Sequence, residues 1–222
     1  MTAILVILTL VFFVSLDAYR LYRERRREAA KRGALALQPF AAIAIPRGLF
    51  LDRSHTWARM TDAGELRVGV DELVTQALGG AERVELPAAG QVIRRGEPLA
   101  TLWRQGRKLS VPSPVDGTVV GSNDRLQRDP NLLADDTYGA GWLAAIWPLE
   151  LREAVRGLKV GEAARRLLER EVQRFVDFLT LHPAPAAQPA LADGAHPIVG
   201  AAIQLDDLNW LRFQNDFCSI RD

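Results

Sequence analysis

The sequence has a single cysteine, Cys218, and three histidines in 222 residues. One cysteine excludes an internal disulfide and a cluster of thiolate metal ligands. The histidines, His55, His182 and His196, lack the spacing of a metal site, so a metalloenzyme is not expected. The net charge is only +1, and no overall positive field indicates a nucleic acid partner.

Catalytic and nucleotide-binding motifs are also missing. Gly79-Gly80 is not followed by the Lys-Ser/Thr of a phosphate loop, and Gly139-Ala140-Gly141 lacks the third glycine of a dinucleotide site. No Gly-x-Ser-x-Gly elbow is present. Asp135-Asp136 is typical of a turn, and Cys218 lacks the basic neighbours that activate a thiol. The sequence therefore predicts a protein without enzymatic activity.

An uncharged apolar run covers residues 3–16 near the N-terminus. Extended to residue 22, it is about 20 residues or roughly 30 Å as a helix, one hydrocarbon thickness. We therefore predict a transmembrane anchor over residues 1–22. The side chains expected at the membrane interface are Tyr19, Arg20, Tyr22, Arg23, Arg25, Arg26 and Arg27.

The order of charge and apolarity predicts the topology of this anchor. A cleavable signal peptide would have basic residues before the apolar run, whereas here they follow it. Positive charge marks the cytoplasmic side, so we expect a single-pass protein of the cytoplasmic membrane with its N-terminus outside and its soluble domain in the cytoplasm. Residues 23–47 are expected to form a basic juxtamembrane helix and a linker.

A folded domain is expected over residues 48–148. Short apolar runs at 66–70, 83–86, 99–103 and 117–120 are separated by Gly, Pro, Asn and Asp, which predicts the strands of a small barrel or sandwich. Residues 71–78 predict one helix, ended by the two glycines that follow.

The remaining third of the chain has a helical pattern. Residues 149–182 form an amphipathic helical region, in which 161–181 carry apolar residues at i, i+3, i+4 and i+7. Residues 183–197 have the composition of a linker, and 198–222 predict a C-terminal apolar helix. An apolar tail after a linker needs a surface to dock on. Its own domain is the expected surface, and a partner is the alternative.

Several separated segments together resemble one family. They are His55-Thr56-Trp57, Val68-Gly69-Val70-Asp71, Val84-Glu85-Leu86-Pro87, Ser113-Pro114-Val115-Asp116-Gly117 and Tyr138-Gly139-Ala140-Gly141-Trp142-Leu143. In order and spacing, from about residue 49 to residue 148, they resemble the H protein of the glycine cleavage system. The resemblance implies a mainly β fold, a lipoyl-like barrel-sandwich hybrid with a helix at its side. Within that fold, His55, Trp57 and Trp142 are expected to be packing residues.

The resemblance fails at the residue that carries the family's chemistry. In H proteins, lipoate is attached to a lysine at the tip of the hairpin between the segments that match Gly96-Glu97-Pro98 and Ser113-Pro114-Val115. These arms align without a gap and put Gly106 at the lysine position, and Trp103 replaces an acidic residue of the family. Gln105-Gly106 favours a tight turn. We therefore expect a non-lipoylated member with no cofactor.

The predicted function is that of a membrane-anchored, noncatalytic module, a protein-interaction or scaffold subunit at the cytoplasmic membrane face. Its basic hairpin tip, Arg104, Arg107 and Lys108, is expected to contact an acidic partner or anionic headgroups. The alternative is a lipoyl carrier of a glycine-cleavage-type or related redox system, loaded on Lys108. A biotinyl-type or efflux-adaptor hairpin of the same fold matches less well, because the segment 138–143 resembles H proteins.

Overall fold

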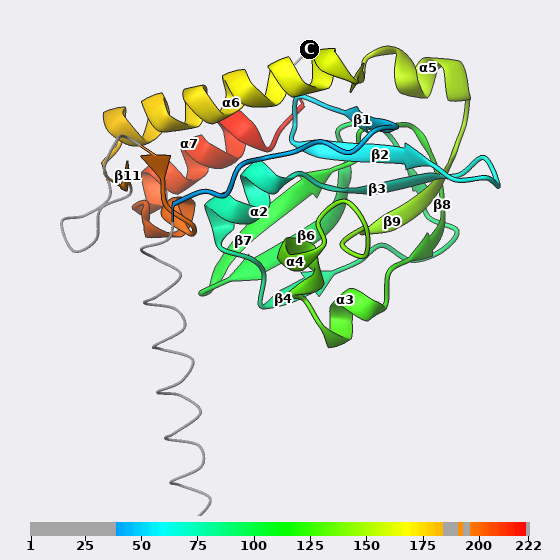
Figure 1. Ribbon diagram of the computed structural model, residues 1–222. Coiled ribbons are helices and arrows are strands. Elements are labelled where there is room, and N and C mark those ends of the chain that lie inside the picture. Colours follow the sequence, from blue (N-terminus) through cyan, green and yellow to red (C-terminus); the bar gives the residue numbers. More distant parts are fainter. Residues whose placement is uncertain (1–38, 184–190, 193–195, 221–222) are drawn as a thin grey trace, which may run out of the picture.

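The computed structural model describes residues 39–183, 191–192 and 196–220, and its core consists of two antiparallel sheets (Figure 1). The larger sheet has the order β10-β1-β2-β3-β9-β8-β5 and the smaller the order β4-β6-β7. The strands of the larger sheet are β1 (Leu49–Leu51), β2 (Thr56–Met60), β3 (Leu66–Val70), β5 (Val92–Ile93), β8 (Gly117–Ser122), β9 (Ala144–Pro148) and β10 (Lys159–Val160). Those of the smaller sheet are β4 (Arg83–Glu85), β6 (Pro98–Arg104) and β7 (Arg107–Pro112). The mainly β, lipoyl-type fold expected from the sequence is confirmed.

The predicted strands lie where their apolar patterns placed them. Strand β3 buries Leu66, Val68 and Val70 on one face, and on the other face Arg67 is exposed whereas Gly69 is buried. Gly69 lies against the indole of Trp57, where a Cβ atom would come within 2.6 Å of the ring. The buried Trp57 donates its indole N–H to the Val70 carbonyl at 2.9 Å, as expected of a packing residue.

The predicted side helix is α2 (Glu72–Leu78). Asp71 caps it, with Oδ1 accepting the Val74 N–H at 3.1 Å. Gly79 ends the helix at a φ of +72°, a left-handed conformation that glycine adopts without steric cost. Two single-turn helices, α3 (Arg125–Arg128) and α4 (Leu132–Asp135), follow β8.

The C-terminal third consists of helices that pack on the barrel. They are α5 (Leu151–Arg156), α6 (Glu162–Leu181), the 3-10 helix η1 (Ala201–Gln204) and α7 (Asp207–Phe217). The C-terminal apolar helix expected within residues 198–222 is α7, and the separate η1 precedes it because the backbone is extended at Leu205 and Asp206 caps α7. Figure 1 shows α6 and α7 side by side along one side of the barrel.

Aromatic side chains bind α6 and α7 to each other and to the barrel. Phe175 and Phe178 of α6 meet Phe213 and Phe217 of α7 at ring distances between 5.5 and 6.5 Å. These rings belong to one buried cluster that includes Leu49 and other residues of the barrel. The apolar C-terminal segment thus docks on its own domain, the expected one of the two surfaces.

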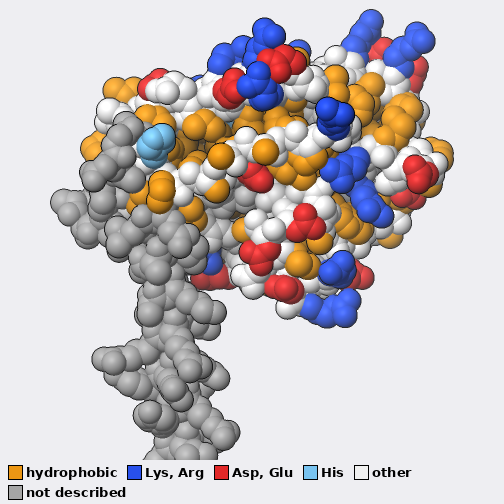
Figure 2. Space-filling view, in the orientation of Figure 1, with side chains coloured by type: hydrophobic (Ala, Val, Ile, Leu, Met, Phe, Trp, Pro, Cys, Tyr) orange, Lys and Arg blue, Asp and Glu red, His pale blue; other side chains and the backbone are white. Residues whose placement is uncertain are grey.

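Part of each predicted linker is packed. Pro39 forms a bridge with Ile198, and Phe40 donates its N–H to the Pro197 carbonyl at 2.8 Å and stacks on Phe175. Residues 40–43 and Ile45 lie beside α6 and line a groove of about 420 Å³ with Leu168. Figure 2 shows hydrophobic side chains gathered on this face, below the charged side chains of α6. In the second linker, β11 (Leu191–Ala192) pairs with β12 (His196–Pro197).

The predicted anchor, residues 1–22, and the interface residues between 19 and 27 lie outside the described residues. Within the part of the chain that is described, no helix combines the length and the apolarity needed to cross a membrane.

Candidate functional site

The β6–β7 hairpin has the tight turn that its sequence predicts. Arg104 pairs with Arg107, so Gln105 and Gly106 alone connect the strands. Their φ angles are +48° and +78°, the pair of positive values that a type I′ turn requires. Gly106 therefore stands at the apex of the hairpin, at the position that the ungapped alignment gives it.

The apex has no group to which an acyl cofactor could be attached. Gly106 has no side chain, and a Cβ atom built on it would meet nothing within 4 Å. Lys108 is exposed but lies within β7, paired with Trp103 of β6 rather than at the turn. Trp103 stacks on Arg83, whose guanidinium lies 4.4 Å from the ring centroid. Lipoate thus does not fit the apex residue of this hairpin.

The three basic residues predicted at the tip have different environments. Lys108 is exposed, whereas Arg104 and Arg107 are half-buried. The Arg107 guanidinium donates to the Leu205 carbonyl, lies 3.5 Å from the Asp207 carboxylate and stacks over Trp210 at 5.2 Å. The three side chains therefore do not form one uniformly exposed patch.

Helix α7 covers the β7 side of the hairpin. With its amide oriented to satisfy both neighbours, Gln214 donates to the Lys108 carbonyl at 3.1 Å and accepts the Trp210 indole N–H at 2.9 Å. Trp210 and Gln214 are one helical turn apart, so the same face of α7 contacts both Arg107 and Lys108. Helix α7 thus contacts the β6–β7 hairpin at Arg107 and Lys108, next to the turn at the hairpin's tip.

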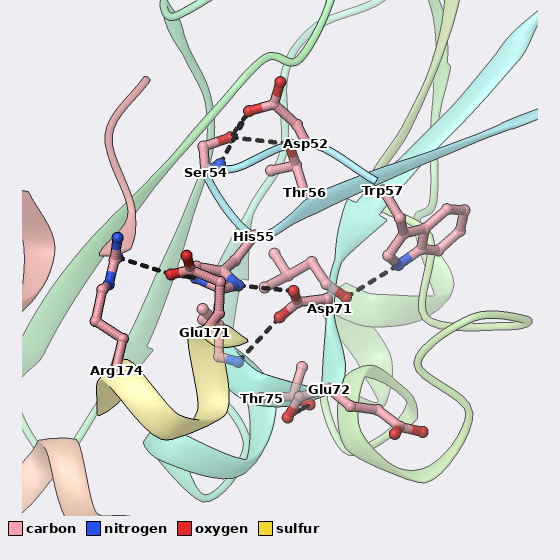
Figure 3. A network of polar contacts seen from close by, with 12 residues as sticks. Asp52, Ser54, His55, Thr56, Trp57, Asp71, Glu72, Thr75, Glu171 and Arg174 are labelled. Atoms are coloured by element: carbon pink, nitrogen blue, oxygen red, sulfur yellow. Dashed lines mark hydrogen bonds and ion pairs between the residues drawn. The ribbon is translucent and has the colours of Figure 1, made fainter. Parts of the chain in front are cut away.

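A buried ion network connects the barrel to α6 (Figure 3). His55 is 1% exposed, and its Nδ1 lies 2.8 Å from Oδ2 of Asp71, the residue that caps α2. Its Nε2 lies 3.4 Å from Oε2 of Glu171 on α6. Burial alone would lower the pKa of His55, but the two carboxylates outweigh it and raise the pKa to about 9. His55 is therefore a cation between two anions at neutral pH.

The network extends to α7. Arg174 forms an ion pair with Glu171 at 2.9 Å, donates to the Asp216 carbonyl and covers the ring of Phe217 at 4.2 Å. Burial would raise the pKa of Glu171, but His55 and Arg174 hold it below its ordinary value. His55 is buried, as the sequence-based interpretation expected of a packing residue, and its ion pair with Glu171, which that interpretation did not include, connects the barrel to α6.

Two further predictions concern Asp136, expected in a turn, and Cys218, expected to be unreactive. The carboxylate of Asp136 accepts the Ala140 N–H at 2.6 Å and so builds the predicted turn. Burial raises the pKa of the Cys218 thiol, which keeps it uncharged and poorly reactive. Over the described ranges of the chain, no three His, Cys, Asp or Glu side chains are grouped to hold a metal ion.

Sequence reasoning missed Glu171, Arg174 and the contacts of α7. The helical pattern of 161–181 was interpreted as one apolar face and one charged face, so no charged residue of it was expected to turn toward the barrel. A glutamate in the row of apolar positions of α6 was the available signal, since Glu171 adjoins Val172 and lies four residues after Leu167.

Comparisons with known proteins agree with this architecture. The sequence model of the family described as "Glycine cleavage H-protein" matches residues 49–171. The glycine cleavage system H protein of Coprothermobacter proteolyticus is 38% identical over 102 residues, 46% of this chain and 80% of the relative. That of Rubrobacter xylanophilus is 35% identical over 127 residues, 57% of this chain and 98% of the relative.

A solved structure, that of a glycine cleavage system H protein from Mycobacterium marinum, is also similar, with 27% identity and a TM-score of 0.48 over 57% of this chain and 98% of that one. The family match ends at Glu171, within α6, so η1 and α7 lie beyond it. On the strength of the match over residues 49–171, the chain belongs to the glycine cleavage H-protein family.

Proposed function

We propose that this chain is a noncatalytic, membrane-anchored module of the H-protein type, a scaffold or protein-interaction subunit at the cytoplasmic membrane face. The observation that carries the proposal is Gly106 at the apex of a two-residue turn. A swinging acyl cofactor needs an amine at that apex, and glycine has none. The sheets around the apex are present, so the surface of the barrel is available to a partner although the apex has no amine.

The fastened hairpin supports the same proposal. Arg107 is held by Asp207 and Trp210, and the Lys108 carbonyl is held by Gln214. These contacts fix the strand next to the tip to a helix outside the family match. A fixed surface suits a binding module, because a rigid contact surface loses less entropy when a partner binds.

The proposal is tested by loading the purified, detergent-solubilised chain with lipoate and a lipoate ligase, followed by intact-mass measurement. An authentic H protein serves as the positive control. The expected result is an unchanged mass for this chain under conditions that load the control. An acyl increment on this chain would contradict the noncatalytic reading.

One observation favours the alternative carrier function. Lys108 is exposed and lies two residues from the apex, so its amine is accessible to an enzyme. If the carrier function holds, the acyl increment appears on the wild-type chain and disappears in Lys108→Ala. The matched control is Lys159→Ala, which removes a lysine of the edge strand β10 and would leave the increment in place.

The proposed partner contact of the basic tip is tested by co-purification from solubilised membranes. Lys108→Glu reverses the exposed charge of the tip without breaking the Arg107 contacts to α7. Arg152→Glu on α5 reverses an exposed charge elsewhere and is the control. A protein that is recovered with the wild type and with Arg152→Glu, but is depleted several-fold with Lys108→Glu, supports the contact. Equal recovery in all three samples excludes Lys108 from the contact.

A further inference from the structure

Three exposed leucines lie at one end of the helical layer. Leu181 is 76% exposed, Leu208 is 60% and Leu211 is 56%. The contacts between the two helices place these residues together. Arg174 contacts Asp216 and Phe178 contacts Phe213, so α6 and α7 run antiparallel. The last turn of α6 therefore lies beside the first turns of α7, and all three leucines belong to the same end.

The polypeptide from residues 1–38 joins the domain at this end as well. Pro39 forms its bridge with Ile198, three residues before η1 begins at Ala201. Figure 1 shows the first described residues, in blue, next to the orange segment that leads into α7. The first described residue is thus fixed to the segment that leads into η1 and α7, the helix that carries Leu208 and Leu211, rather than to the far edge of the barrel, where β5 lies.

The length of the connecting chain limits how far this end can be from the bilayer. The 16 residues from 23 to 38 separate the proposed anchor from Pro39. They span about 24 Å as a helix and at most about 55 Å when fully extended. A connection of either length enters the domain at the leucine-bearing end, and the shorter the connection, the closer this end lies to the bilayer.

The charges around the leucines are mixed. Asp206 and Asp207 precede Leu208, and Arg107 and Arg212 lie close to them, with Arg107 paired to Asp207. Such a surface has no strong attraction to anionic headgroups. Exposed leucines at helix ends, in contrast, partition into the interfacial region of a bilayer through apolar burial alone.

We infer that Leu181, Leu208 and Leu211 form a lipid-contacting surface, which places the end of the helical layer where α6 ends and α7 begins on the bilayer. This inference rests on the proposed membrane anchoring and adds which face of the domain meets the lipid. It also gives the C-terminal extension a role, since α7 would then hold the hairpin at a fixed orientation to the membrane.

The test uses the full chain reconstituted into neutral phosphatidylcholine vesicles that contain nitroxide-labelled lipids. An environment-sensitive fluorophore is attached to Leu208→Cys or Leu211→Cys, and the buried Cys218 stays unlabelled. The control is Val92→Cys on β5, an apolar residue that is 73% exposed at the far edge of the larger sheet. The expected result is quenching several-fold stronger at the two α7 positions than at position 92. Equal quenching at all three positions overturns the inference.

Flotation and alkaline extraction of the same vesicles separate this inference from the proposed anchoring. A chain that resists extraction while its α7 labels stay unquenched is anchored without the leucine contact, so the inference alone fails. A chain that does not float overturns both. Anionic lipid is added in a further sample, and an unchanged contrast is expected. If quenching is stronger at the α7 positions than at position 92 only when anionic lipid is present, the contact is electrostatic, which contradicts the inferred apolar contact of the leucines.

Discussion

His55 of the barrel and Glu171 of α6 meet across the junction between the two parts of the molecule, with Nε2 and Oε2 3.4 Å apart. Glu171 is also the last residue of the family match, so this contact stands where the shared barrel ends and the extra C-terminal helices begin. The ion pair and the phenylalanines beside it make the extension a continuation of the core rather than an appendage.

Replacing His55 by glutamine is expected to lower the free energy of unfolding by about 3 kcal/mol near neutral pH, because Asp71 and Glu171 lose the cation between them. His196→Gln changes an exposed histidine and is the control. Urea unfolding of the detergent-solubilised chain, followed by circular dichroism, provides the measurement. A loss no larger than that of His196→Gln would show that the buried charge does not stabilise the junction.

The same network predicts how stability depends on pH. The pKa of His55 is about 9 in the folded protein against an ordinary value of 6.5, so its contribution is complete below pH 6.5 and is lost as the pH rises through 9. The unfolding free energy should therefore fall by about 3 kcal/mol over this window. His55→Gln should remove most of that slope. A wild-type slope that the substitution leaves intact would assign the pH dependence to another group.

Trp210→Ala is expected to release the hairpin from α7. The indole covers Arg107, bonds to Gln214 and packs on Phe213, so its loss should cost about 3 kcal/mol and expose β7. Amide hydrogen exchange should accelerate in β7 more than in β3. Leu208→Ala removes an exposed side chain of the same helix and should leave both rates unchanged. Equal acceleration in both strands would indicate general unfolding instead of a released hairpin.

Gly69→Ala tests the close packing of β3 on Trp57. The new methyl group would lie within 2.6 Å of the indole ring, so we expect a loss of about 2 kcal/mol as the ring shifts. Gly121→Ala is the matched control, because a Cβ atom there meets nothing within 4 Å. Thermal unfolding of the two variants should differ by several degrees. Similar melting temperatures would show that the Trp57 ring moves aside at little cost.

The barrel could be predicted from the sequence because its signals are local. Each signal lies within the element that it predicts. Gly79 marks the end of α2, the apolar pattern of 66–70 predicts β3, and Gln105-Gly106 predicts the turn between β6 and β7. The helical layer was only partly predictable. The division between η1 and α7 depends on Asp206 as a cap, which a general apolar pattern does not reveal.

Of the hairpin site, only the apex residue could be predicted from the sequence. The position of Gly106 followed from counting residues along the two arms, and the register between Arg104 and Arg107 agrees with that count. The contacts of Arg107 with Leu205 and Trp210 join residues about 100 positions apart. Such pairings depend on how α7 docks, and no local pattern in the sequence records them.

Gly106→Lys would restore an amine at the apex. No atom lies within 4 Å of the new Cβ, so the substitution should be tolerated at a cost of about 1 kcal/mol for the positive φ. Incubated with lipoate and its ligase, the variant should gain an acyl increment that the wild type lacks. Failure of the variant to load would mean that the fastened hairpin, and not the missing amine alone, prevents modification.

The central claim is that no acyl cofactor is carried on the hairpin, and the most direct measurement is the mass of the protein isolated from its own cells. Peptide mapping of residues 96–115 from native membranes should return only unmodified masses. A dithiolane acyl group on Lys108, or on any other residue of the hairpin, would contradict the account and make the protein a carrier.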